Sequence, residues 1–286
     1  MKAWAGAAII AIGVVVAISA AVSLFGLRRL SPGPSAGGEE PVKTAGGGMI
    51  DSRQDVSIML ERPDARSTKG GKMQVRLIPV TMFQSNCVVA WDEITGDGVL
   101  FDTGGDAGRI IDFVRSKGIQ VKAIFLTHGH VDHVAGTNRV KKELAVPVYL
   151  HPEDRPLADA TSRQCLMFGI PMEDAPEVDH DLAEGEKFAF GSLEFTALHL
   201  PGHSPGCTAF LFSGEKPVLV SGDVLFESSI GRTDLPGGDM DKMKESLNRL
   251  KQLADDVVVV PGHGRQTSIG REKKLNPYLS ESFSMW

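Results

Sequence analysis

The chain contains few cysteines and no cluster of basic residues. Its three cysteines, Cys87, Cys165 and Cys207, are widely spaced and form no CxxC pair, which argues against a zinc knuckle, a redox pair or a disulfide framework. The simplest interpretation is that the three cysteines act as small buried apolar residues. The formal net charge is −6 and no long run of Lys or Arg occurs, so no nucleic-acid partner is expected.

Long apolar runs are also missing, with one exception at the start of the chain. No residue between 3 and 27 is charged, and Ala, Ile, Val and Leu dominate this segment. At about 1.5 Å per residue, a helix of this length would span a bilayer core of roughly 30 Å with some tilt. A cleaved signal peptide usually has a shorter apolar region, of about 7–15 residues. We therefore predict that residues 1–30 form a transmembrane helix that anchors the protein in a membrane.

The segment that follows differs in composition, and residues 31–72 are rich in Gly and Pro. They are expected to form a flexible linker to a folded domain at residues 73–286. Arg28 and Arg29 outweigh Lys2 across the apolar run, which favours a cytoplasmic location for that domain. Two alternatives remain: cleavage of a signal peptide near the small residues 19–21, and an internal start at Met73.

Patterns typical of strands and helices alternate from residue 74 onward. Strands are expected at residues 75–80, 86–91, 98–101, 121–126, 146–150, 193–198, 208–212, 218–221 and 257–260. Helices are expected at residues 107–117, 137–144 and 241–253. Because strands and helices that alternate in this way pack with helices on the faces of sheets, the sequence predicts an α/β fold.

Four candidate metal ligands follow directly after the apolar strand expected at residues 121–126. They are His128, His130, Asp132 and His133. Neutral imidazole and carboxylate are natural ligands of zinc and iron. Gly129 has no side chain, which lets the turn bring the first two histidines toward one point. The pattern predicts a metal site at the end of a buried strand.

Three further candidates lie at the ends of later strands. His203 occurs in the motif PGHSPG, Asp223 in SGD and His263 in PGHG. Each motif has the same order of apolar strand, glycine and potential ligand. Together with the loop at 128–133 they make seven ligands, which are too many for one tetrahedral zinc but suit two ions that share a carboxylate and a water.

The remaining histidines carry weaker signals. His199 lies at a strand end four residues before His203 and is expected to be structural, with support of a metal ligand as the alternative. His151 and His180 lie in polar segments, so both are expected to be exposed.

The motif HxHxDH followed by PGHSPG, SGD and PGHG resembles the metallo-β-lactamase superfamily over about residues 73–279. The resemblance implies a four-layer αβ/βα sandwich with two divalent metal ions in a cleft between its sheets. Zinc is the expected metal, although iron and manganese accept the same ligands. By the same resemblance, one ion takes His128, His130 and His203, the other takes Asp132, His133 and His263, and Asp223 bridges both.

Two bound metal ions would explain a hydrolytic activity. A water shared by two cations has a pKa far below that of bulk water, so hydroxide is available near neutral pH. That hydroxide would attack a carbonyl carbon while the metals stabilise the developing oxyanion. Asp132 and Asp223 are the catalytic candidates, because both hold the ions and Asp132 can also orient the nucleophile.

Three segments resemble the glyoxalase II-like branch, the hydroxyacylglutathione hydrolases and their short relatives: residues 84–87, 102–106 and 222–234. The resemblance implies a small-molecule substrate, a glutathione thioester. Arg232 stands where that branch has a basic residue, and its planar guanidinium suits a substrate carboxylate or amide. An ion pair with Asp234 is the alternative for Arg232.

The chain departs from glyoxalase II at two places. Asp234 stands where that enzyme has a tyrosine near the substrate. After His263 only 23 residues remain, which are too few for the C-terminal helical domain that supplies further glutathione contacts. Short relatives that lack this domain are nevertheless grouped with the enzyme.

Persulfide dioxygenases provide the main alternative. They resemble the chain at residues 231–234 and use one iron, held by residues that match His128, His203 and Asp223. Two histidines and a carboxylate with open positions are a known non-haem iron arrangement. The motif PGHG and residues 269–272 match the short glyoxalase II type better, so a hydrolase is preferred.

Other members of the superfamily are less favoured. Asp223 would be an unusual bridge in a class B β-lactamase, and His130 argues against flavodiiron proteins, which have a carboxylate there. A tRNA 3′-processing nuclease would carry a long basic arm, and no such segment occurs. A scaffold protein with a decayed site is not supported, because all seven ligands are present.

Overall fold

The computed structural model describes residues 57–59 and 73–279. The predicted transmembrane helix at residues 1–30 lies outside these residues, as does most of the predicted linker. No helix within the described ranges is long and apolar enough to cross a membrane. Within the linker segment, β1 (Ser57–Met59) pairs antiparallel with β2 (Met73–Val80), so these three residues belong to the first sheet.

The first sheet has the strand order β1-β2-β3-β4-β5-β6-β7. Its other strands are β3 (Ser85–Asp92), β4 (Asp97–Phe101), β5 (Gln120–Phe125), β6 (Val148–Leu150) and β7 (His180–Asp181). Strands β2 to β4 are antiparallel, whereas β4 to β7 pair in parallel. The parallel part needs crossover helices, which cover the outer face of this sheet.

The second sheet has the order β15-β14-β11-β10-β9-β8. Its strands are β8 (Lys187–Phe190), β9 (Leu193–His199), β10 (Thr208–Phe212), β11 (Val218–Gly222), β14 (Val258–Pro261) and β15 (Thr267–Ser268). All its pairs are antiparallel except β11 with β14. A short hairpin of β12 (Leu225–Phe226) and β13 (Ser229–Ile230) follows β11.

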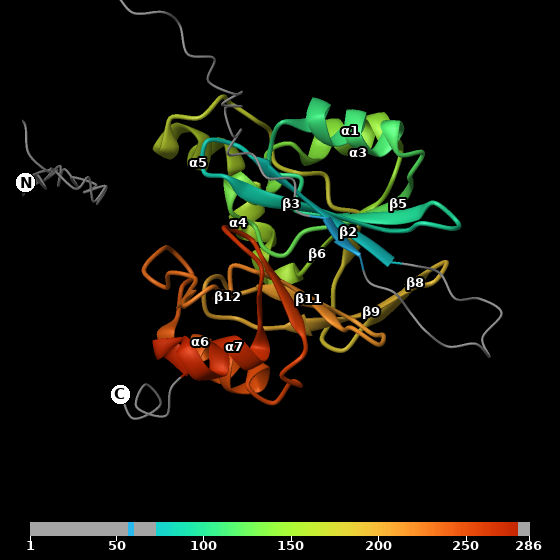
Figure 1. The fold of residues 1–286 in the computed structure, drawn as a ribbon. Helices are drawn as coiled ribbons and strands as arrows, with labels where there is room; N and C mark the ends of the chain where they lie inside the picture. Colours follow the sequence, from blue (N-terminus) through green and yellow to red (C-terminus); the bar gives the residue numbers. More distant parts are fainter. Residues whose placement is uncertain (1–56, 60–72, 280–286) are drawn as a thin grey trace, which may run out of the picture. The chain divides into compact units, whose positions relative to one another are not determined.

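Helices lie on the outer face of each sheet (Figure 1). The helices of the first half are α1 (Ala107–Ser116), α2 (Val131–Val134), α3 (Thr137–Leu144), α4 (Arg155–Asp159) and α5 (Thr161–Phe168), with the 3-10 turn η1 (Pro152–Asp154). Those of the second half are α6 (Met240–Leu250), α7 (Ile269–Leu275) and the 3-10 turn η2 (Pro277–Leu279). Figure 1 shows α1 and α3 against the first sheet, and α6 and α7 against the second.

Three apolar cores hold these layers together. The core between the two sheets is built on the contacting rings of Phe101, Phe125, Phe195 and Phe210, with centroids of Phe101 and Phe210 4.9 Å apart. A second core packs α1 and α3 on the first sheet, and a third packs α6 on the second sheet. Because the central strands are buried on both faces, β10, β11 and β14 are almost continuously apolar. The architecture is the expected αβ/βα sandwich.

Most of the predicted elements occur close to their expected positions. The helix predicted at 241–253 ends at Leu250, and the strand predicted at 146–150 begins at Val148, after Pro147. The elements that were not predicted include α2, α4, α5 and α7 and the strands β7, β8, β12, β13 and β15. All of these are short, so their apolar periodicity is weak. All three cysteines are buried, as expected.

Candidate metal centre

The predicted ligands come together where strands of both sheets end. The loop with His128 and His130 follows β5 and leads into α2, and His203 lies between β9 and β10. Asp223 follows β11, and His263 follows β14. The two sheets are joined at this place, because the Asn86 backbone N–H donates to the Gly262 carbonyl at 2.7 Å. The structure brings all seven predicted ligands into one region.

The first group of ligands consists of His128, His130 and His203. Their ligand atoms all lie within 4.8 Å of one another, and all three side chains are buried. Nδ1 of His130 lies 2.8 Å from Nε2 of His203. Nε2 of His128 is buried and has no hydrogen-bond partner. A buried polar atom without a partner is costly, and a bound cation would satisfy it.

The second group consists of Asp132, His133 and His263, again with ligand atoms within 4.8 Å of one another. Nε2 of His263 lies 3.2 Å from Nε2 of His133 and 3.2 Å from Oδ2 of Asp132. One carboxylate oxygen and two imidazole nitrogens that converge in this way form a donor set suited to a divalent transition metal.

Asp223 lies between the two groups. Its Oδ1 is 3.6 Å from Nε2 of His133, and its Oδ2 is 3.6 Å from Nε2 of His203. Oδ1 is buried without a hydrogen-bond partner. A Cβ at Gly262 would lie 2.1 Å from this oxygen, so the glycine before His263 is required by the close approach of the carboxylate. The position is suited to a bridging ligand.

The rings of the histidine ligands are oriented by hydrogen bonds to their other nitrogens. Asp102 accepts hydrogen bonds from the Thr127 backbone N–H at 2.7 Å, from Thr127 Oγ1 at 2.8 Å and from His133 Nδ1 at 2.9 Å. Thr127 Oγ1 in turn accepts from Nδ1 of His128 at 3.0 Å. Asp102 therefore fixes the tautomers of two ligands, so that each presents Nε2 to a metal.

Backbone carbonyls orient two further ligands. Nδ1 of His203 donates to the carbonyl of Arg232 at 2.7 Å, and Nδ1 of His263 donates to that of Phe83 at 3.2 Å. Both histidines are therefore held with Nε2 facing the site.

Asp154 joins the loops that carry the ligands. Its buried carboxylate accepts hydrogen bonds from the Gly129 backbone N–H at 2.8 Å, from Ser204 Oγ at 2.7 Å and from the Gly206 N–H at 2.6 Å.

The sequence alone assigned no role to Asp102 or Asp154. Asp102 did carry a signal, because it is a polar residue directly after an apolar strand, as the ligands are.

The electrostatics of the site favour cations. Burial, together with the neighbouring His203, lowers the pKa of His130 to about 3. Burial also holds the pKa of His128 well below its usual value, with His133 contributing. The pKa of His133 behaves differently: burial lowers it, but the surrounding carboxylates, Asp132 first, raise it to about 10. The lowered pKa values keep His128 and His130 neutral at pH 7, which is the state in which imidazole binds a metal. The raised pKa of His133 shows that the carboxylates around it favour a positive charge at the second group.

A cavity of about 410 Å³ lies over the ligands. Five of the seven ligands line it, together with mostly apolar side chains. Arg232, the predicted substrate-binding residue, also lines it and is exposed. Its guanidinium donates two hydrogen bonds of 2.7 Å to Asp234. The structure thus shows the ion pair with Asp234 and also places Arg232 at the cavity.

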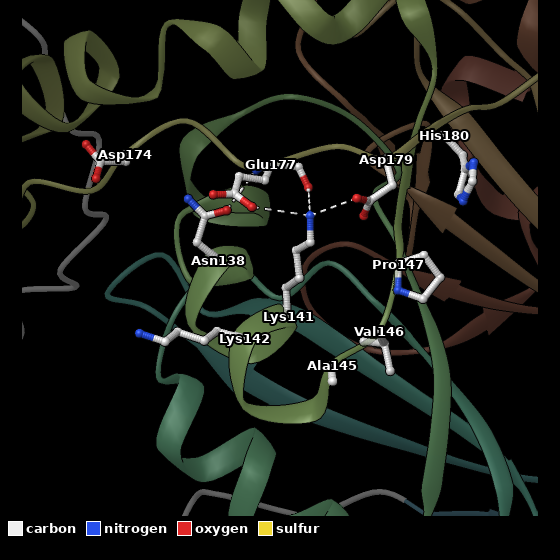
Figure 2. A pocket seen from close by; sticks show the side chains of 10 residues that line it. All are labelled: Asn138, Lys141, Lys142, Ala145, Val146, Pro147, Asp174, Glu177, Asp179 and His180. Carbon is white, nitrogen blue, oxygen red and sulfur yellow. Dashed lines mark hydrogen bonds and ion pairs between the residues drawn. The ribbon is translucent and has the colours of Figure 1, made fainter.

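A larger groove of about 770 Å³ lies between α3 and residues 174–180 (Figure 2). Figure 2 shows Lys141 reaching the carbonyl and carboxylate of Glu177 and the carboxylate of Asp179. Lys141 is therefore already paired within the groove, and none of the seven ligands lines the groove. The smaller cavity over the ligands is the candidate active site.

Of the remaining histidines, His180 is exposed as expected, but His151 is buried. The expectation of exposure for His151 was wrong, because its ring stacks on that of His199 with centroids 4.0 Å apart and planes 13° apart. Since a ligated metal must lie near the plane of each ring, two nearly parallel rings are poorly placed to share one ion. Nε2 of His199 also donates to the Pro205 carbonyl at 2.8 Å, which supports a structural role.

The fold and the two groups of ligands define a class of protein. The family described as the metallo-beta-lactamase superfamily matches residues 80–263, a range that includes all seven ligands. The chain belongs to this superfamily. Its relatives include proteins named as a hydroxyacylglutathione hydrolase and as a probable metallo-hydrolase.

Individual relatives indicate the glyoxalase II-like branch. The chain is 39% identical over 211 residues to the hydroxyacylglutathione hydrolase GloC of Haemophilus influenzae, a match that covers 73% of this chain and 99% of the relative. Among solved structures, it is similar to the B3 metallo-beta-lactamase BLEG-1, with 37% identity, 72% and 99% coverage and a TM-score of 0.67. It is also similar to TTHA1623 in a di-iron-bound form, with 36% identity, 71% and 99% coverage and a TM-score of 0.63.

Proposed function

We propose that the protein is a binuclear metal-dependent hydrolase of glutathione thioesters. The observation that carries this proposal is the pair of three-residue ligand groups with Asp223 between them. Similarity to a hydroxyacylglutathione hydrolase over nearly the whole length of that relative supports the substrate class. Zinc is the proposed metal. Iron and manganese are alternatives, and the similarity to a di-iron protein makes iron a serious one.

The residues of the site have distinct roles in this proposal. His128, His130 and His203 would hold one cation, Asp132, His133 and His263 the other, and Asp223 both. Two bound cations supply a water of lowered pKa and polarise a carbonyl oxygen. In the overall reaction a C–O bond forms from water, the C–S bond breaks, and a carboxylic acid and a thiol are released. Asp132 lines the cavity, so its carboxylate can accept a hydrogen bond from the attacking water and orient it.

Arg232 is proposed to bind a carboxylate of the glutathione moiety. It lines the cavity, and its backbone carbonyl holds His203, so its position relative to the ligands is fixed. The pair with Asp234 is exposed on both sides, and exposed ion pairs contribute little stability. A substrate carboxylate can therefore compete for the guanidinium at low cost.

Two other functions are weighed against this one. A persulfide dioxygenase would need a single iron, on His128, His203 and Asp223, whereas the structure has a complete second group of donors around His133. Similarity to BLEG-1 supports β-lactam hydrolysis as a second alternative. The position of Asp223 argued against this activity at the level of the sequence. The same site could attack a β-lactam amide, because that reaction also adds water to a carbonyl.

Metal analysis combined with three assays tests the proposal. The purified protein is assayed for metal content, for hydrolysis of S-lactoylglutathione, for hydrolysis of a chromogenic cephalosporin and for oxygen consumption with glutathione persulfide. Two metals per chain with thioester turnover is the expected result. One iron per chain with oxygen consumption would contradict the hydrolase, and faster turnover of the cephalosporin than of the thioester would contradict the substrate class.

We also propose that residues 1–30 anchor the enzyme in a membrane, with residues 31–72 as linker and the catalytic domain on the cytoplasmic side. The support is the uncharged run between residues 3 and 27. Extraction of native membranes with alkaline carbonate, followed by N-terminal sequencing, tests this. Release into the soluble fraction, or a first residue at Met73, would contradict the anchor.

A further inference from the structure

The active-site cavity has two chemically different ends. Around His263 the walls are aromatic: Phe83 provides the carbonyl that binds the Nδ1 of His263, and the ring of Phe226 lies 6.1 Å from the His263 ring at 90°. Phe168 completes this end, with its ring 5.8 Å from that of Phe83. We call Phe83, Phe168 and Phe226 the aromatic wall. The end near His203 instead carries Arg232, whose carbonyl binds that histidine.

The aromatic wall is held in place by hydrogen bonds to the metal-binding loop. Phe168 ends α5, and Gln164 of the same helix accepts from the Val131 N–H at 3.1 Å and donates to the Gly129 carbonyl at 3.2 Å. Phe83 lies in a turn whose Thr81 N–H donates to Asp106 at 3.1 Å. The wall is therefore positioned relative to the ligands before any substrate binds, which is the condition for a specificity pocket.

The rings of the wall are apolar surface without a protein partner to cover it fully. Phe83 and Phe168 are each 37% exposed, although both line a concave cavity. Exposed apolar side chains grouped in a cavity are typical of a ligand-binding site. Among the lining residues in the described part of the chain, Arg232 is the only cation. The cavity can therefore take one anionic group near His203 and one bulky apolar group near His263.

We propose that this enzyme prefers thioesters with a bulky apolar acyl group, such as an aromatic one. This rests on the proposed thioester hydrolase function. The acyl group would lie on the aromatic wall, with the carbonyl over the ligands and a carboxylate of the thiol at Arg232. The methyl of a lactoyl group is too small to cover three aromatic rings, whereas a phenyl group would cover more of their exposed surface and gain ring contacts.

The test compares two glutathione thioesters that differ in one group. S-Mandeloylglutathione carries a phenyl where S-lactoylglutathione carries a methyl, and both are α-hydroxyacyl thioesters. We expect kcat/KM to be about tenfold or more higher for the mandeloyl compound, a typical effect for apolar groups in a fitted pocket. Phe168→Ala should lower this ratio several-fold, because it removes one ring of the wall.

Ile94→Ala is the matched control. Ile94 is an exposed apolar residue, 72% accessible, in the turn after β3, whereas Phe83 lies in the turn before β3. This variant should leave the ratio of the two kcat/KM values unchanged. If the lactoyl compound is hydrolysed as fast as the mandeloyl compound or faster, the proposed preference is wrong, although the hydrolase function is not affected. An unchanged ratio of the two kcat/KM values in Phe168→Ala would also contradict the proposal.

Binding of the product acids gives a readout that does not depend on turnover. Titration calorimetry of the metal-loaded protein should show tighter binding of mandelate than of lactate, with the difference reduced in Phe168→Ala. If neither thioester is hydrolysed, the proposed function fails. The calorimetric affinities for mandelate and lactate then test the preference for an apolar group on their own. Equal affinity for the two acids would contradict it.

Discussion

The carboxylate of Asp102 accepts the Nδ1 hydrogen of His133 at 2.9 Å, and both side chains are buried. Since Asp102 also binds Thr127, which accepts from His128, a single carboxylate orients one ligand in each of the two groups. The two candidate metal positions are therefore coupled through a residue that lies outside both proposed ligand groups. Changes at Asp102 should affect both.

Asp102→Asn is expected to lower metal affinity about 10–100-fold, as is typical when a partner of a metal ligand is changed. The amide can no longer accept all three hydrogen bonds, because its NH2 group must face either the Thr127 N–H or the Nδ1 of His133. The arrangement that fixes the tautomers of the ligands is therefore disturbed. Dialysis against metal buffers, with metal content measured at each concentration, gives the affinity.

Asp92→Asn is the matched control for Asp102→Asn. Asp92 is also buried, and it accepts from the Ile94 and Thr95 N–H groups at the opposite end of β3 from Ser85. It should cost stability without changing metal affinity. Equal metal affinity in Asp102→Asn and Asp92→Asn would contradict the role of Asp102.

His263→Ala is expected to reduce the metal content from two ions to one per chain. His263 belongs only to the group with Asp132 and His133, and it is partly exposed, so its loss should leave the first group folded and able to bind. Elemental analysis after gel filtration measures the ratio. The exposed His180 provides the control, since His180→Ala should retain both ions. Two tightly bound ions in His263→Ala would rule out the assignment of this ligand.

Arg232→Ala is expected to raise KM for a glutathione thioester about tenfold with little change in kcat. A charged hydrogen bond to a substrate carboxylate is worth about 1.5–3 kcal/mol, and about 1.4 kcal/mol corresponds to tenfold. Arg115→Ala is the control, because Arg115 is equally exposed and pairs with Glu143 at 3.1 Å on the α1–α3 surface. Steady-state kinetics that show the same KM for both variants would refute a substrate contact.

Glu272→Gln is expected to destabilise the protein by about 2 kcal/mol at neutral pH. The buried carboxylate accepts from Thr267 Oγ1 at 2.6 Å, the Ser228 N–H at 2.7 Å and Asn276 Nδ2 at 2.9 Å. In the glutamine variant, one carboxylate oxygen is replaced by an NH2 group. This group would face hydrogen-bond donors and could not accept from them. The hairpin that carries Phe226 would lose one of its connections to α7, while those made by Arg271 would remain.

The effect of Glu272 depends on pH. Burial raises the pKa of Glu272, but its hydrogen bonds lower it below its usual value of 4.5. Because the folded pKa is lowered, its contribution is fully present above pH 4.5 and is lost as the pH falls through the folded value. Urea denaturation at several pH values should show the difference between wild type and Glu272→Gln shrinking in acid. The exposed Glu245→Gln should show no such trend, and a difference independent of pH would contradict the prediction.

Much of the site could be predicted from the sequence because its signals are local. In His128-Gly129-His130 and in the motifs around His203, Asp223 and His263, an apolar strand, a glycine and a ligand follow one another along the chain. Buried strands have a fixed geometry, so residues at their ends are placed by short-range rules. The order of strands and helices, and hence the fold class, was readable for the same reason.

The tertiary structure decided what depends on residues distant in sequence. Asp154 binds Ser204, which lies 50 positions later, and Phe83 reaches His263, which lies 180 positions later. The aromatic wall draws Phe83, Phe168 and Phe226 from three separate segments, and of these only Phe226 lies in a segment that resembles the glyoxalase II-like branch. Hydrogen bonds and ring contacts between such segments form only when the two sheets pack. They therefore cannot be predicted from the local sequence. The ligands follow from the sequence, whereas the shape and polarity of the cavity over them follow from the fold.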